Sequence, residues 1–329
     1  MAKAIHVRVP GTSANCGPGF DCLGLACSIY NDLTLTLTEE PGLSIDIRGD
    51  GARIIPRDER NVVWRSVRYL LDKAGHTEWQ GGRLELVNHI PLSRGLGSSA
   101  AAIVAGLKAA NVWLGNPFNR HELLQFATDI EGHPDNVAPA IYGGFTSSIS
   151  QDGHVECLTF LPRYRMRYVV AVPDFPLPTK KAREVVPQEV TRADAVYNIG
   201  RASMLVGALC KGSERYLRYA LDDALHQPYR AKLIPGMYEV FAAAKQAGAY
   251  GASLSGAGPC LIAFVPENRH CADDVAYAMQ KRFADFNVRA RMLNMRLDTR
   301  GAHVINERPQ ADADAKTATV DQPQANADA

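Results

Sequence analysis

A glycine-rich turn between a predicted strand and a predicted helix constrains the fold of this chain more than any other feature. Residues 91–102 read Pro-Leu-Ser-Arg-Gly-Leu-Gly-Ser-Ser-Ala-Ala-Ala, after an apolar run at 84–90. Gly95 and Gly97 allow a positive φ and a close approach of the backbone to a ligand. We expect Ser98 and Ser99 to cap the helix, whose free N–H groups and positive dipole end then attract an anion. The sequence therefore predicts a phosphate site, most simply for a nucleotide.

Two common phosphate loops are excluded by the residues of this turn. No Gly-Lys-Ser/Thr follows the glycines, as a Walker A loop requires. The third glycine of the dinucleotide-binding fingerprint is also missing. For this segment taken alone, an ordinary strand-to-helix turn with a serine cap remains the alternative.

Three separated motifs together resemble the GHMP kinases, the small-molecule kinases of galactose, homoserine, mevalonate and phosphomevalonate. The turn at 91–100 resembles the phosphate loop of that family. Residues 9–24 (Val-Pro-Gly-Thr-Ser-Ala-Asn-Cys-Gly-Pro-Gly-Phe-Asp-Cys-Leu-Gly) resemble the opening motif of its homoserine kinases, and residues 251–259 resemble its third, glycine-rich motif. The resemblance implies an α+β fold with two domains. These are an N-terminal α/β kinase domain with a left-handed βαβ crossover and a ferredoxin-like C-terminal domain.

Composition and charge narrow the partners and the location. A chain of 329 residues is long enough for one large or two medium domains. The net charge of +1 gives no basic excess, so we expect neither nucleic acid nor an anionic membrane as a partner. We see no membrane-length apolar run and no signal peptide. The seven scattered cysteines without a Cys-x-x-Cys pair are typical of reduced thiols, so we expect a cytoplasmic location.

The order of the predicted elements indicates two domains and a tail. We predict an ATP-binding domain at 1–165 and a C-terminal domain at 166–308, with the boundary near 162–165. Residues 309–329 are rich in Ala, Asp, Gln and Thr, so we predict a disordered tail. The predicted strands are 33–38 (half-exposed), 44–47, 168–172, 260–265 and 288–292, and the predicted helices are 60–74, 120–130, 193–211, 214–220, 236–246 and 272–283.

Phosphoryl transfer needs a phosphate cradle, a divalent metal ion and a pocket that aligns the acceptor oxygen. The resemblance assigns ATP to Asn61, Val62, Pro91, Arg94, Gly95, Leu96, Gly97, Ser98 and Ser99, with the first two beside the base and ribose. It also implies that Ser98 and Glu131 hold Mg²⁺, a hard ion that prefers oxygen ligands. Without the resemblance, Glu131 could equally be a surface carboxylate. A zinc site from Glu131, His133 and Asp135 lacks a fourth ligand nearby.

The acceptor pocket of an amino-acid alcohol needs partners for a carboxylate, an ammonium group and a hydroxyl group. Arginine forms a two-pronged pair with carboxylates. Arg183 and Arg230 stand in segments that resemble those of homoserine kinases in which an arginine binds the substrate carboxylate, although residue type alone favours the solvated surface. The resemblance assigns the substrate to Asn15, Asp21, His133, Asp135, Asn136, Thr179, Arg183 and Arg230, with Asp135, Asn136 and Arg183 as the catalytic candidates.

One departure from the family concerns the base. Mevalonate- and galactose-type relatives use an aspartate as base and a lysine from the opening motif, and the matching places here hold Asn136 and Thr12. Asparagine cannot take a proton at neutral pH. We therefore predict catalysis by positioning and charge neutralisation without a dedicated protein base, which a loose phosphoryl-transfer transition state allows.

The sequence thus predicts a phosphotransferase with an alcohol acceptor, an ATP-dependent kinase that converts L-homoserine to O-phospho-L-homoserine on the route to threonine. The resemblance also implies a homodimer. Three alternatives remain: a sister kinase of mevalonate or a sugar, a non-catalytic ligand sensor of the same fold, and a nicotinamide-dependent enzyme. The paired arginines and the missing lysine weigh against the first, the retained Ser98 and Glu131 against the second, and the missing third glycine against the last.

Overall fold

The computed structural model describes residues 3–305, which form two β-sheets covered by helices. The strands are β1 (Ile5–Ala14), β2 (Leu23–Thr38), β3 (Gly42–Gly49), β4 (Gly81–Asn88), β5 (Phe145–Gln151), β6 (His154–Phe160), β7 (Met166–Pro173), β8 (Gly251–Leu254), β9 (Leu261–Pro266), β10 (Ala290–Met295) and β11 (His303–Val304). The helices are α1 (Val62–Lys73), α2 (Ser98–Trp113), α3 (Arg120–Glu131), α4 (Pro134–Tyr142), α5 (Thr179–Glu184), α6 (Arg192–Lys211), α7 (Glu214–Ala220), α8 (Gln227–Arg230), α9 (Met237–Gln246) and α10 (Ala272–Asp285), with short 3₁₀ turns at Ala231–Leu233 and Glu267–Arg269. The predicted tail at 309–329 lies outside the described residues.

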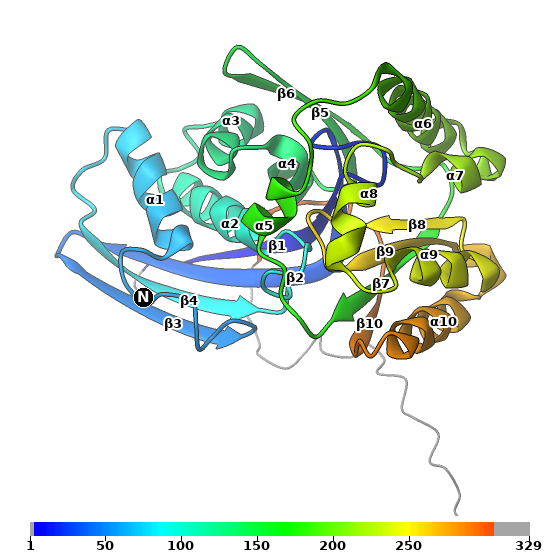
Figure 1. Ribbon diagram of the computed structural model, residues 1–329. Coiled ribbons are helices and arrows are strands. Elements are labelled where there is room, and N and C mark those ends of the chain that lie inside the picture. The colour runs from blue at the N-terminus through cyan, green and yellow to red at the C-terminus, as the bar shows by residue number, and fades with distance from the viewer. Residues whose placement is uncertain (1–2, 306–329) are drawn as a thin grey trace, which may run out of the picture.

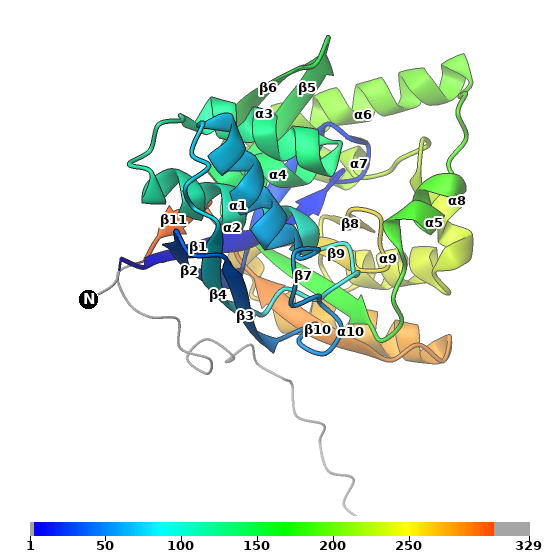
Figure 2. The same ribbon diagram turned by 90° about the vertical axis from the view of Figure 1, so that its left-hand side faces the viewer.

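The first sheet has the order β11-β1-β2-β4-β3, with the β5–β6 hairpin attached to β2. β3 and β4 are parallel and are joined through α1, which makes the βαβ unit of this half. The helices α1 to α4 lie on one face of the sheet (Figures 1 and 2). The long strand β2 pairs with β1, β4 and β5 in turn, so it organises the whole sheet.

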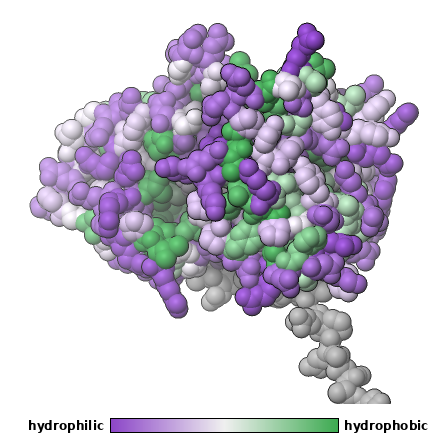
Figure 3. Space-filling view, in the orientation of Figure 1, coloured by the Kyte–Doolittle hydropathy of each residue, from purple (hydrophilic) through white to green (hydrophobic). Residues whose placement is uncertain are grey.

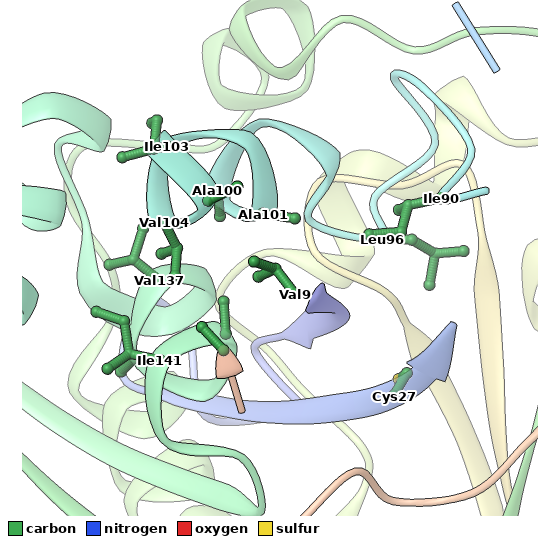
Figure 4. Close-up of a cluster of buried hydrophobic side chains, with 14 of the residues drawn as sticks. Val9, Cys27, Ile90, Leu96, Ala100, Ala101, Ile103, Val104, Val137 and Ile141 are labelled. Atoms are coloured by element: carbon green, nitrogen blue, oxygen red, sulfur yellow. The ribbon is translucent and has the colours of Figure 1, made fainter. Parts of the chain in front are cut away.

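The core beneath these helices fixes the position of α2, the helix that follows the glycine-rich turn. Its residues Ala100, Ala101 and Val104 are almost completely buried, and small side chains there let neighbouring elements approach closely. Val104 lies beside Val137 and Ile141 of α4, and Ala101 faces β1 (Figure 4). The N-terminus of α2 is therefore held by packing on both sides.

The second sheet is antiparallel with the order β10-β7-β9-β8, and α9 and α10 pack against it. Chain order and strand order together give the ferredoxin-like arrangement that was expected. Alternate residues of β7 serve two cores: Val169 packs toward α9 and α10, whereas Val170 belongs to the core of the first sheet. One face of this sheet therefore packs against α9 and α10, and the other face packs against the first half of the protein.

Most predicted elements are present within a few residues, and two expectations were wrong in detail. The residue before the first turn of α2 is Gly97 with φ 67°, and no side chain caps the helix, so Ser98 and Ser99 begin it instead of capping it. Thr34 was expected to be half-exposed but is buried, because its hydroxyl is bonded to His6 on the adjacent strand. β11 returns to the first sheet beside β1, and the predicted domain boundaries stay a prediction.

Candidate functional site

The glycine-rich turn is wedged between the opening motif and the third glycine-rich motif. A Cβ at Gly95 would lie 2.2 Å from the carbonyl oxygen of Ser255, and one at Gly97 would lie 1.9 Å from Oγ1 of Thr12. Both glycines have positive φ, 82° and 67°. Ser255 also donates a hydrogen bond to the carbonyl of Gly95 (2.6 Å). These positions accept only glycine, because the backbone conformation and the close contacts both exclude a side chain.

The turn delivers the N-terminus of α2 into a cavity of about 160 Å³ between the two halves of the protein. First-turn N–H groups of a helix have no partner within the helix, so this end of α2 can bind an anion. Most of the predicted site residues line this one cavity: Asn15, Asp21, Pro91, Arg94, Gly95, Gly97, Ser98, Ser99, Glu131, His133, Asp135, Asn136, Thr179, Arg183 and Arg230. The structure thus brings together segments that lie more than 200 residues apart.

Three predicted nucleotide contacts do not line the cavity: Asn61, Val62 and Leu96. Leu96 is fully buried in the core. The Asn61 side chain caps α1, accepting from the backbone of Val63 (2.9 Å) and donating to Pro56 (2.8 Å). Its polar atoms are therefore already used within the fold, and its contact with a nucleotide stays a prediction.

Glu131 faces the first turn of α2 from the end of α3. Its carboxylate accepts a hydrogen bond from Ser99 (3.0 Å), whereas Ser98, the predicted metal partner, lines the same cavity. Burial raises the pKa of Glu131 above its ordinary value, against the opposing effects of His133 and Ser99. A partly buried carboxylate beside a hydroxyl suits a hard cation such as Mg²⁺, which takes few protein ligands and completes its shell with phosphate and water. Among residues 3–305, no group of three or more His, Cys, Asp and Glu side chains could hold a metal ion.

An ion pair crosses the acceptor side of the cavity. Arg183 of α5 donates two hydrogen bonds to the carboxylate of Asp21, at 2.9 and 3.0 Å. Asp21 lies in the opening motif and is held by Asn15, whose side-chain oxygen accepts from the Asp21 backbone (3.1 Å). Both members of the pair stay about one-third exposed, 37% and 35% for the arginine and aspartate side chains. The two predicted charge partners of an amino acid therefore neutralise each other in this structure.

Arg230 lies deeper, with only 1% of its surface exposed. Its guanidinium donates to the carbonyls of Ala182 (3.0 Å) and Gly256 (3.2 Å) and to a ring nitrogen of His226 (3.2 Å). Among the residues that the structure describes, no carboxylate lies within ion-pairing distance of it. Burial, with the neighbouring Arg183, lowers the pKa of Arg230 to about 10. A buried cation without a counter-ion is costly unless an anion joins it.

A third cluster lies at the start of α4. His133 and Asp135 are hydrogen-bonded through Nδ1 and Oδ1, and Asp135 is 1% exposed. Burial alone would lower the pKa of His133, but the hydrogen bond and charge of Asp135 outweigh it, so the pKa is raised. Asn136 accepts a hydrogen bond from Thr12 (2.8 Å). The two residues that stand in place of the aspartate and lysine of other relatives are thus direct neighbours.

Sequence reasoning missed the residues that hold Arg230 from behind. The ring of Phe20 stacks on His226, with centroids 5.1 Å apart, and Asp223 accepts from the backbone N–H groups of His226 (2.8 Å) and Gln227 (2.6 Å). The segment 226–230 was singled out for its arginine alone. No sequence motif marks the histidine, because its contact with Gly17 joins residues 209 positions apart, and the spacing of four residues to Arg230 is not specific to this role.

A larger hollow of about 720 Å³ lies elsewhere, at the edge of the second sheet. It is lined by residues such as Arg165, Glu214 and Arg296, and it contains none of the predicted site residues. Within residues 3–305, none of the helices combines the length and the apolar character needed to cross a membrane.

Comparisons with known proteins agree with this geometry. The family model for the GHMP kinases N terminal domain matches residues 61–144, and the model for the GHMP kinases C terminal matches residues 205–285. A homoserine kinase from Carboxydothermus hydrogenoformans is 45% identical over 309 residues, which cover 94% of this chain and 99% of that protein. A homoserine kinase from Gloeobacter violaceus is 46% identical over 83% of this chain and 91% of its own length.

Solved structures show the same relation. The crystal structure of a homoserine kinase from Cytophaga hutchinsonii superposes with a TM-score of 0.85 at 33% identity, covering 93% of this chain and 98% of that one. A mevalonate kinase from L. major in complex with R-mevalonate has a TM-score of 0.68 at 19% identity, over 92% of this chain and 97% of that one, which shows a shared fold and no more.

Proposed function

The chain belongs to the GHMP kinase family, and we propose that it transfers the terminal phosphoryl group of ATP to the side-chain hydroxyl of L-homoserine, giving O-phospho-L-homoserine. The observation that carries the choice of acceptor is Arg230, a buried guanidinium in the wall of the cavity without a carboxylate partner. An amino-acid carboxylate supplies the missing charge. Mevalonate also carries a carboxylate, but it has no ammonium group for the acidic side chain nearby.

The acceptor binds by exchanging an internal ion pair for two external ones. In the ligand-free structure Asp21 and Arg183 neutralise each other. The ammonium group of homoserine pairs with Asp21, and its carboxylate pairs with Arg183 and Arg230. A zwitterion gives each of these charged groups an opposite partner, with its one carboxylate shared by the two arginines. A ligand with only one of the two charges leaves either the aspartate or the arginines without a partner, which is costly at a partly buried site. Asn15 and Thr179 complete the walls of this pocket.

The nucleotide occupies the other end of the cavity. The first-turn amides of α2 and the backbone of Gly95 to Ser99 hold its phosphates, with Pro91 and Arg94 on the flank. Glu131, with the hydroxyls of Ser98 and Ser99, would hold Mg²⁺, which supplies charge neutralisation of the phosphates when bound. Asn61 and Val62 would lie beside the base and ribose, as the family resemblance implies, whereas Leu96 is buried in the core beneath the loop.

Transfer proceeds by positioning, without a dedicated protein base. The carboxylate of Asp135 is hydrogen-bonded to His133, and Asn136 cannot accept a proton at neutral pH. Both side chains orient the acceptor hydroxyl, whose oxygen bonds to the phosphorus as the bond to ADP breaks. The hydroxyl proton stays on that oxygen until late and then passes to a phosphoryl oxygen or to water, as a loose transition state allows. The proposal also includes a homodimer and a cytoplasmic location, as the family resemblance and the cysteine content indicate.

The test is ADP release with Mg·ATP and a panel of L-homoserine, mevalonate, galactose, L-threonine and L-serine. We expect turnover with homoserine, and its loss in Glu131→Ala but not in Glu156→Ala, a carboxylate exposed on β6. Turnover confined to another acceptor would keep the phosphate site and overturn the roles of Arg183 and Arg230. ATP binding without turnover of any acceptor would favour a sensor.

A further inference from the structure

Among the described residues, His226 is the fully buried histidine that directly contacts Arg230, a residue predicted to bind the substrate. Its Nδ1 faces a guanidinium N–H of Arg230 at 3.2 Å, and its Nε2 faces the carbonyl oxygen of Gly17 at 2.8 Å. A guanidinium can only donate and a carbonyl can only accept. The ring must therefore accept at Nδ1 and donate at Nε2, which fixes it as the neutral imidazole with its proton on Nε2.

Burial keeps this ring neutral. Burial lowers the pKa of His226, and the charge of Arg230 adds to that effect, while Asp223 opposes it. The nearest carboxylate, Asp223, has its Oδ2 3.6 Å from Nε2. That carboxylate is already occupied by three backbone N–H groups and by Asn198 (2.8 Å). Asp21, the other acidic group on this side, is taken by Arg183.

We infer that His226 is a positioning residue for the substrate carboxylate: as a neutral acceptor it holds Arg230 in place without cancelling its charge. This inference rests on the proposed function and explains how Arg230 is held for the substrate carboxylate. A carboxylate at the same place would hold the arginine equally well but would neutralise it. An apolar residue would leave the charge free but the guanidinium loose.

The same ring links the arginine to the opening motif. Nε2 of His226 donates to Gly17, and Phe20, three residues on, stacks on the ring face. The guanidinium carbon of Arg230 lies 5.3 Å from the centroid of the Phe20 ring. Asp21 follows directly, so the arginine for the carboxylate and the aspartate for the ammonium group are fixed relative to each other through one imidazole.

The test compares two substrates in the wild type and in His226 variants, so that the effect of the substrate carboxylate is measured with and without the histidine. L-Homoserine is compared with 3-amino-1-propanol, which keeps the hydroxyl and the amine and lacks the carboxylate. In wild-type protein we expect the loss of the carboxylate to reduce kcat/KM about 10²–10³-fold, as for a charged hydrogen-bonded partner. In His226→Glu we expect this ratio to shrink at least tenfold, through a higher KM for homoserine, while KM for ATP stays within twofold. His226→Gln, which keeps an acceptor and a donor, should stay near the wild type.

Matched controls separate this role from a structural one. His121→Glu adds the same charge at an exposed histidine and should leave the ratio unchanged. If His226→Glu does not fold, His226→Met replaces it, with a raised KM for homoserine and unchanged KM for ATP as the expected result. Nitrogen NMR of the wild-type ring should show the neutral Nε2–H form from pH 6 to 8.

Three results would overturn the inference. The first is a carboxylate ratio in His226→Glu equal to that of the wild type. The second is an equal loss of ATP and homoserine affinity in His226→Met, and the third is a charged or Nδ1–H ring in the NMR spectra. If instead the wild type fails to turn over homoserine, the proposed function fails, and the carboxylate role of His226 fails with it.

Discussion

The two ends of the cavity differ in the groups that form them, which are backbone groups at the phosphate end and side chains at the acceptor end. The phosphate end consists of backbone: two glycines with positive φ, a helix N-terminus and a tight contact with Ser255. The acceptor end consists of charged side chains from four separate segments, represented by Asp21, Asp135, Arg183 and Arg230. Backbone groups offer the same amides to any nucleotide phosphate, whereas the side chains match the charges of one small molecule. We therefore expect the fold to determine the reaction type and these replaceable side chains to determine the acceptor.

The face of the protein shown in Figure 3 is mostly polar, with apolar side chains between the polar ones. Inside the cavity, Arg183 is paired with Asp21 and His133 with Asp135, whereas Arg230 has no carboxylate partner among the described residues. Substitutions should therefore separate into two classes, those that remove phosphate chemistry for every acceptor and those that change only the acceptor.

The largest effect is expected from Gly95→Ala. The added methyl would meet the carbonyl of Ser255 at 2.2 Å in a conformation that disfavours side chains, so the turn must move away from the phosphates. We expect turnover to fall by a factor on the order of 10³ for every acceptor, together with about 2 kcal/mol or more of lost stability. ADP release and denaturant unfolding measure the two effects.

Gly115→Ala is the matched control, since Gly115 has φ 88° but open space around it. It should cost about 1 kcal/mol of stability and leave turnover unchanged. Equal activity losses in both variants would show that the close packing of the phosphate turn is unimportant.

The next effect tests the acceptor end through Arg183→Lys. Lysine keeps the charge but cannot make the two-pronged contact with a carboxylate. We expect KM for homoserine to rise about 10- to 100-fold, with KM for ATP unchanged, because only one end of the cavity is altered. An equal rise in both constants would mean that the two ends are not independent. Arg192→Lys, at an exposed helix start, serves as the control.

The glycine-rich turn and the helix that follows it could be predicted from the sequence, because their signal is local. Glycines at 95 and 97, between a strand and a helix, carry the conformation in their own residue types. The mistake there was the role of Ser98 and Ser99, since the glycine before them supplies the helix start without a side-chain cap. Nothing local distinguishes a serine that caps from one that faces a carboxylate.

The acceptor end could be predicted only through the family resemblance. Its ion pair joins residues 162 positions apart, Asp21 and Arg183. His226 had no signal of its own, because only the fold brings it to Gly17, 209 positions away, while it holds Arg230 four residues on. Which side chains pair depends on how the two sheets pack together, and that packing is not written in any short stretch of residues.

A smaller effect is expected from Asp135→Asn, which decides whether the acceptor end contains a base. If positioning alone is at work, kcat should fall by about tenfold or less. A true base would contribute on the order of 10²–10⁴-fold. Loss of turnover with homoserine affinity intact would identify Asp135 as the base and contradict the proposed mechanism. The measurement is kcat and KM for homoserine at saturating Mg·ATP.

The smallest effect concerns the pH dependence of stability through His133. The pKa of this histidine is raised in the folded protein, since the hydrogen bond and charge of Asp135 outweigh burial. Its contribution to stability is therefore fully present below the ordinary value of about 6.5 and is lost as the pH rises through the higher folded value. Arg183 and Glu131 also face the ring, and their effects oppose each other.

The melting temperature of the wild type should thus decline between pH 6.5 and 8.5 more steeply than that of His133→Gln. His121→Gln, an exposed control, should retain the wild-type slope. If the melting temperature changed equally with pH in the wild type and in His133→Gln, the histidine would not stabilise the charge of Asp135. The charges of the acceptor end would then be balanced by Arg183 and Arg230 alone.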